Sequence, residues 1–128
     1  MTTIDKIEEL LGVLNDFPNQ ISELQLNLIE LNHQLKEVNS KLIDKTAEIK
    51  AIIQDQLDDD RKKLYSNAEA RETAFIIESK SNPEYCEIHQ KVLDLQMQIQ
   101  KTNIEIEKLQ NQQRNTRIVI TALTSLLD

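Results

Sequence analysis

The sequence has little of what sheets and compact cores need: one Gly, two Pro, no Trp, and two each of Phe and Tyr among 128 residues. An all-β or α/β domain of this length contains many tight turns, which a single glycine does not supply. The one cysteine, Cys86, excludes a disulfide framework. Hydrophobic residues, mostly Leu and Ile, make up 39% of the chain. These absences predict an all-α protein with few aromatic core residues.

Basic clusters are also scarce. The chain has 22 acidic and 15 basic residues, which give a formal net charge of −7. Binding to duplex DNA normally uses a clustered basic face, since phosphate neutralisation supplies much of the affinity. The one basic run, residues 61–63, directly follows the three aspartates 58–60. The acidic balance argues equally against an anionic membrane surface. We therefore expect no direct contact with nucleic acid or membrane.

Long apolar runs are missing too. No run approaches the ~20 residues of a membrane-spanning helix, and the N-terminal sequence lacks the basic and apolar regions of a signal peptide. We therefore expect a cytoplasmic protein in which Cys86 stays reduced.

Heptad periodicity is the strongest positive signal. From Ile7 to Ile52, alternating steps of three and four residues reach an apolar side chain at every position except Lys45. A second series runs from Tyr85 to Leu127 with three polar members. Such sustained stripes predict coiled-coil seams, because a repeat of 3.5 residues keeps one narrow face toward a partner helix. At the seam position of Lys45, we expect the stem to pack and the ammonium to reach water.

Helix start signals lie between the two series. Ser66 with Glu69 resembles a capping box that opens a short helix over about residues 67–78. Asn82 followed by Pro83 predicts the N-cap and first residue of the last helix. Pro18 either kinks a continuous first helix or follows a break capped by Asp16. We expect one domain over 1–128, divided into an N-terminal helical segment 1–17, a first long arm 18–64, a tip 65–82 and a second long arm 83–128.

The two arms have nearly equal length and one apolar stripe each, which predicts an antiparallel coiled-coil helical hairpin with the short helix at its tip. In an antiparallel coiled coil, the a positions of one helix's heptads lie opposite the d positions of the other. This rule predicts a register that places Leu24 opposite Ile120, Leu35 opposite Leu109 and Ile52 opposite Val92. A register one heptad away satisfies the same stripes. Asn and Gln fill many positions beside the seams, which fits either assembly of hairpins into a helical bundle or a solvated flank of low charge.

Both free ends of the hairpin are more apolar than a lone hairpin requires. A helix that is apolar over most of its circumference is buried on more than one side. We therefore expect a homo-oligomer, dimeric or higher, with its interface at Ile7, Leu10, Leu14, Phe17, Val119, Leu123 and Leu126.

Candidate chemistry is sparse. Cys86 and His89 have the spacing of two zinc ligands, but the other histidine, His33, belongs to the other arm. Glu30 with His33 matches only half of a di-iron motif. We expect no catalytic, cofactor-binding or metal-binding residues, no cofactor and no small-molecule substrate, hence no enzyme. At the tip, Asn67, Arg71, Phe75 and Ile76 either dock a protein partner or fold back onto the hairpin.

The stretch YSNAEARETAFIIESKSNPEY, followed by Leu and Ile heptads, resembles small coiled-coil proteins of phage and prophage gene clusters. The resemblance covers the C-terminal half and is carried by Asn67, Glu69, Arg71, Glu84 and Tyr85. Such proteins often lie beside recombination or replication genes, so the resemblance implies a setting and not a mechanism. We expect a non-enzymatic, self-associating adaptor or structural subunit. The alternative is an accessory factor in phage-like DNA recombination or replication that acts through a protein partner or as an acidic nucleic-acid mimic.

Overall fold

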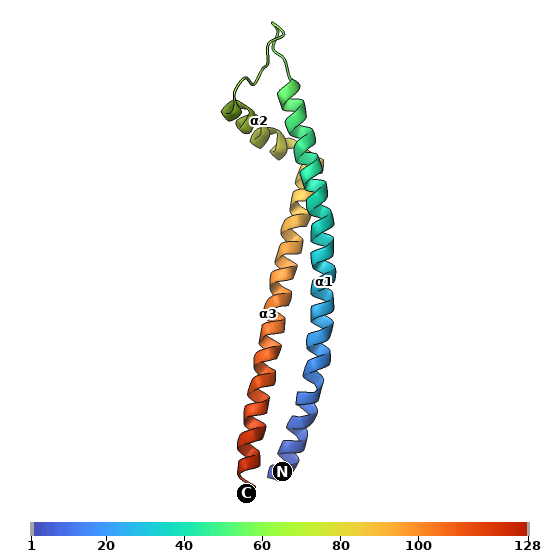
Figure 1. Ribbon diagram of the computed structural model, residues 1–128, viewed down its shortest axis with the longest axis vertical. Coiled ribbons are helices and arrows are strands. Elements are labelled where there is room, and N and C mark those ends of the chain that lie inside the picture. Colours follow the sequence, from blue (N-terminus) through green and yellow to red (C-terminus); the bar gives the residue numbers. More distant parts are fainter. Residues whose placement is uncertain (1, 128) are drawn as a thin grey trace. The chain divides into compact units, whose positions relative to one another are not determined.

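The computed structural model describes residues 2–127 and consists of three helices (Figure 1). These are α1 (Thr3–Asp55), α2 (Ala68–Ser81) and α3 (Pro83–Ser125). Within the described residues there is no β-strand, only an isolated antiparallel bridge between Leu57 and Lys63. The prediction of an all-α protein is therefore confirmed. None of the helices in this part of the chain has an apolar stretch long enough to cross a membrane.

The chain divides into two compact units. Unit 1 comprises the residues up to Asn32 and those from Met97 onward, and unit 2 comprises His33–Gln96. Each unit therefore contains a part of α1 and a part of α3, and unit 2 also contains α2. Each has a hydrophobic core of its own.

The core of unit 1 joins α1 to α3 through the residues of the two heptad stripes. Phe17 and Ile21 of α1 are buried with Ile106 of α3. The side chains packed against this group are again leucines of the stripes, namely Leu14, Leu24, Leu28 and Leu109. Thr102 is buried in this unit, and its hydroxyl donates to the Gln98 carbonyl 2.8 Å away. A polar residue is thus accommodated in the stripe because the helix itself satisfies its hydrogen bond.

The core of unit 2 forms where α2 meets α1. Ile49 and Ile53 of α1 are buried with Ala74 of α2, and three aromatic residues pack against them, namely Tyr65, Phe75 and Tyr85. Ile53 is only 2% exposed, whereas its neighbour Ile52 is 56% exposed. The heptad series predicted the opposite choice, with Ile52 in the seam. An α-helix has 3.6 residues per turn, so its buried face drifts from a strict 3.5-residue stripe, and α2 covers the face that carries Ile53.

The predicted register of the seam is wrong in each unit by about two heptads. In unit 1, Leu24 packs on the cluster that contains Ile106, instead of lying beside Ile120. In unit 2, Lys45 contacts Glu84, although the predicted register places it near Ile99. Both stripes are periodic, so a shift by whole heptads still matches apolar positions. The stripes therefore do not select one register by themselves.

Helix α1 runs without interruption through Pro18. This excludes the alternative in which Asp16 caps a new helix. Pro18 lacks an amide hydrogen, so the helix loses one backbone hydrogen bond there and continues. The helix begins at a reciprocal cap. The Asp5 amide donates to Thr2 Oγ1 at 3.0 Å, and the Thr2 amide donates to Asp5 Oδ2 at 3.2 Å.

Helix α1 ends at Asp55, earlier than the predicted end of the first arm at residue 64. In the connection that follows, Asp58 Oδ1 accepts hydrogen bonds from the amides of Asp60 and Lys62, each at 2.9 Å. Arg61 adopts a positive φ of 60°. The expectation that the first arm continues through these aspartates to residue 64 is therefore wrong. A short carboxylate bonds nearby amides and so favours a turn over a helix.

Side-chain caps define the starts of α2 and α3. Asn67 Oδ1 accepts from the Ala70 amide at 2.7 Å, so the N-cap of α2 is Asn67 and not Ser66 as predicted. Asn82 Oδ1 accepts from the Tyr85 amide at 3.0 Å, and α3 begins at Pro83. The predicted cap and first residue of the last helix are confirmed. Both serine and asparagine are good N-cap residues, so the sequence does not distinguish Ser66 from the adjacent Asn67 as the start of α2.

Candidate interaction surfaces

The residues predicted to form an oligomer interface lie in two different environments of unit 1. Phe17 is buried in the core between α1 and α3. Ile7, Leu10, Leu14 and Leu123 are half-buried. In contrast, Val119 is 45% exposed and Leu126 is 73% exposed. Five of the seven predicted residues are thus buried or half-buried, and Val119 and Leu126 are the two that are exposed.

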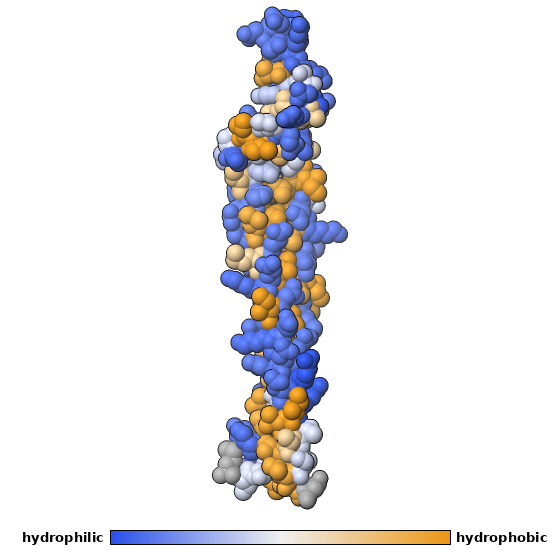
Figure 2. All heavy atoms as spheres, turned by 90° about the vertical axis from the view of Figure 1, so that its left-hand side faces the viewer, coloured by the Kyte–Doolittle hydropathy of each residue, from blue (hydrophilic) through white to orange (hydrophobic). Residues whose placement is uncertain are grey.

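Unit 1 exposes further large apolar side chains near the chain termini. Figure 2 shows hydrophobic atoms gathered over the parts of the helices nearest the chain termini. The exposed members of this group, in addition to Val119 and Leu126, are Ile4, Leu11, Val13, Ile118 and Leu127. Together these residues define the end patch. The sequence signal for it was the excess of apolar residues near the two termini, most of them outside the heptad stripes.

A shallow groove runs along α3 within the end patch. It has a volume of about 430 Å³ and is lined by Arg117, Ile118, Thr121, Ala122 and Ser125. Three of these side chains are small, which opens space beside Ile118. The Ser125 hydroxyl donates to the Ala122 carbonyl at 2.7 Å, so this lining hydroxyl is already satisfied. The groove therefore offers mainly apolar contact, with Arg117 as its charged group.

Charges are segregated between the two helices at this end. In α1, residues 3–16 contain four acidic residues and one lysine, whereas in α3 residues 108–125 contain three basic residues and no acidic one. The ion pair found here is local to α1, between Lys6 and Glu9 at 3.7 Å. Within the described residues, Glu8, Arg114 and Arg117 have no ion-pair partner. The opposite charges of the two helices are thus not paired inside the chain.

The residues predicted for partner docking at the tip largely hold unit 2 together. Asn67 caps α2, and Arg71 Nη1 donates to the Tyr65 carbonyl at 3.5 Å. Phe75 makes an edge-to-face contact with Tyr85, with 5.9 Å between the ring centroids, and Lys50 Nζ lies 5.0 Å from the Phe75 centroid.

The apolar residues that α2 leaves open are Ile76 and, above all, Ile77, which is 64% exposed and was missed as a site residue. Ile77 lines a cavity of about 480 Å³ together with Ala70, Thr73 and Ala74, and the carboxylates of Glu69 and Glu78 line it as well. The triplet of apolar residues at 75–77 was the sequence signal, but spacing alone did not tell which member faces the core.

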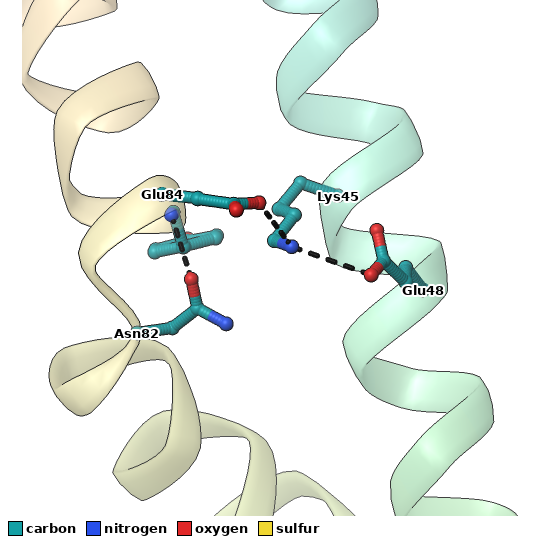
Figure 3. A network of polar contacts seen from close by, with 5 residues as sticks. Lys45, Glu48, Asn82 and Glu84 are labelled. Atoms are coloured by element: carbon teal, nitrogen blue, oxygen red, sulfur yellow. Dashed lines mark hydrogen bonds and ion pairs between the residues drawn. The ribbon is translucent and has the colours of Figure 1, made fainter.

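Lys45 is bound by two carboxylates in unit 2 (Figure 3). Its Nζ lies 2.7 Å from Oε2 of Glu84 and 3.3 Å from Oε1 of Glu48, and the side chain is 12% exposed. The hydrogen bond to Glu84 raises the pKa of Lys45, and the same bond lowers the pKa of Glu84. The stem is packed, and the ammonium lies at the surface between the two exposed carboxylates, at the start of α3.

Cys86 and His89 do not form a ligand pair. The Cys86 thiol donates to the carbonyls of Ser79 and Lys80, at 3.4 and 3.5 Å, while His89 stacks on Tyr85 with 5.8 Å between the ring centroids. Over residues 2–127, no group of three or more His, Cys, Asp or Glu side chains is placed to hold a metal ion.

No family model matches this chain, and no match is found among curated proteins or among solved structures.

Proposed function

We propose that the protein is an antiparallel coiled-coil hairpin that self-associates through the end patch and serves as a non-enzymatic adaptor or structural subunit in the cytoplasm. The hairpin is supported by contacts within each unit. Leu24 and Ile106 belong to one cluster in unit 1, and Lys45 binds Glu84 in unit 2. In unit 1 the clustered residues of both helices belong to the heptad stripes, and in unit 2 the stripe residue Lys45 pairs with Glu84, the neighbour of the stripe residue Tyr85.

Self-association is supported by the end patch, which is the observation that carries the proposal. Val119, Leu126 and Ile118 are exposed although the seam of unit 1 is already filled by other residues. A group of exposed apolar side chains on one part of a surface marks an interaction site more often than scattered single residues do. Burial of these side chains against another molecule would release the water that surrounds them.

An adaptor or structural role is supported by the form of the surfaces. The groove on α3 is lined mainly by small or apolar side chains, whereas the cavity on α2 combines Ala70, Ala74 and Ile77 with polar and acidic side chains. Neither has a nucleophile placed beside a general base, which covalent catalysis would require. Contacts with other polypeptides are the use that such surfaces fit best.

Light scattering on the purified full chain tests the proposal. We expect an oligomer for the wild type, and a lower mass for a variant with Val119→Asn and Leu126→Gln, because it loses two exposed apolar contacts of the end patch. The matched control carries Ile43→Asn and Leu93→Gln, which remove two exposed apolar side chains of unit 2, and should keep the wild-type mass.

A monomeric wild type would contradict self-association. An equal drop in oligomer mass for both variants would show that the interface is not specific to the end patch. Fluorescence anisotropy with single-stranded and duplex DNA at low salt adds an independent check. Tight, salt-dependent binding would favour a direct role in DNA metabolism over an adaptor.

A further inference from the structure

One face of α1 at the end patch combines apolar and acidic side chains. Ile4, Glu8 and Leu11 are spaced at i, i+4 and i+7, so they lie along the same side of the helix. All three are exposed. Glu8 has no ion-pair partner among residues 2–127. This face is apolar at both ends with one free negative charge between them.

The groove on α3 has the complementary character. Arg117 and Ile118 line it beside Thr121, Ala122 and Ser125. Arg117 is exposed and, in the described part of the chain, has no carboxylate partner. The small side chains leave room for a bulky aliphatic group, and Arg117 supplies one positive charge.

A single chain therefore carries both halves of an interface at the same end. An interface with two-fold symmetry needs this arrangement, because each copy offers the same patch and each contact occurs twice. Contact between α1 of one copy and α3 of the other brings opposite charges together. Contact between like helices would oppose acid to acid and base to base, which penalises that pairing.

We propose that a second copy of this chain docks with the Ile4–Glu8–Leu11 face of its α1 in the α3 groove of the first, and reciprocally. Glu8 of each copy then pairs with Arg117 of the other. This inference rests on the proposed self-association and adds which helices meet and which charges select the pairing. The partner that fits the surface is the protein itself.

Reversal of these two charges tests the pairing. Glu8→Lys alone places two positive charges together at both symmetric contacts, and Arg117→Glu alone places two negative charges together. We expect each single variant to raise the dimer Kd at least about tenfold at low ionic strength, measured by sedimentation equilibrium. An equimolar mixture of the two variants forms only complementary contacts in the heterodimer, so its Kd should return to within about threefold of wild type. The double variant should recover in the same way as a homodimer.

The controls are Glu23→Lys and Lys101→Glu, which reverse one exposed charge on each helix of unit 1 outside the proposed contact. Both should stay within about threefold of wild type. Single variants without effect, or a mixture and double variant that stay weak, would overturn the pairing while leaving self-association intact. A wild type that is monomeric at every concentration would overturn the proposed function itself. Circular dichroism on each variant shows whether its helicity is kept. If a single variant unfolds, the Kd of the double variant is the test: a value near wild type supports the pairing, and a weak dimer contradicts it.

Discussion

The Nζ atom of Lys45 in α1 lies 2.7 Å from Oε2 of Glu84, the second residue of α3. Lys45 is the only residue that interrupts the apolar series from Ile7 to Ile52. Its partner lies beside Pro83, where α3 begins. A charge in an apolar seam is tolerated best when a fixed opposite charge meets it, so this contact favours one alignment of α1 with α3 over those shifted by a heptad.

The pH dependence of stability should report this contact. The pKa of Glu84 is lowered from its ordinary 4.5, so its contribution is present above that value and disappears as the pH falls through the lowered pKa. The pKa of Lys45 is raised from 10.5, so its contribution is present below that value and disappears as the pH rises through the raised pKa. We expect Glu84→Gln to melt below wild type near neutral pH, with a gap that closes on acidification below 4.5. Thermal melts followed by circular dichroism measure it.

The control for this prediction is Glu105→Gln, which removes an exposed carboxylate from α3. It should change the melting temperature little at any pH. A gap between wild type and Glu84→Gln that stays constant down to strongly acidic pH would show that the carboxylate charge of Glu84 contributes nothing.

Two adjacent isoleucines provide a matched test of the core of unit 2. Ile53 is almost fully buried against α2, and Ile52 faces outward. Ile53→Ala should lower the free energy of unfolding by about 2–5 kcal/mol, because it removes buried methyl groups and leaves a cavity. Ile52→Ala should change it by less than about 0.5 kcal/mol. Urea titration of both variants makes the comparison, and a larger loss at Ile52 would restore the strict heptad assignment.

The N-cap of α2 can be tested in the same way. Asn67→Ala removes the acceptor for the Ala70 amide and should cost about 0.5–2 kcal/mol of stability. Ser66→Ala should be near neutral, because the Ser66 side chain does not cap the helix. Hydrogen exchange at the first amides of α2 locates the effect. If these amides exchanged faster in Ser66→Ala than in Asn67→Ala, Ser66 and not Asn67 would be the N-cap.

Local interactions were readable from the sequence because they act over a few residues. The Asn82–Pro83 start of α3 and the helical class of the whole chain depend on side-chain capping and on the scarcity of turn residues. The apolar excess near the termini is also visible in the sequence. Val119 and Leu126 lie outside the heptad stripe, and both are exposed in the structure.

The roles of the tip residues needed the packed structure. Phe75, Ile76 and Ile77 are consecutive and all apolar, and only contact with Ile49 and Ile53 explains why Phe75 turns inward while Ile77 stays exposed. Likewise, Ser66 and Asn67 are both good caps, and only the hydrogen bond from the Ala70 amide to Asn67 Oδ1 shows which of them begins α2.

The sequence by itself determined that the chain is helical and that each long helix carries one apolar stripe. Only the tertiary structure decided where α1 stops, which isoleucine is buried and which residues of α1 and α3 meet. The physical reason is that capping and periodicity are local and repeat every heptad. Contacts between residues far apart in the sequence, such as that of Lys45 with Glu84, are visible only in the folded chain.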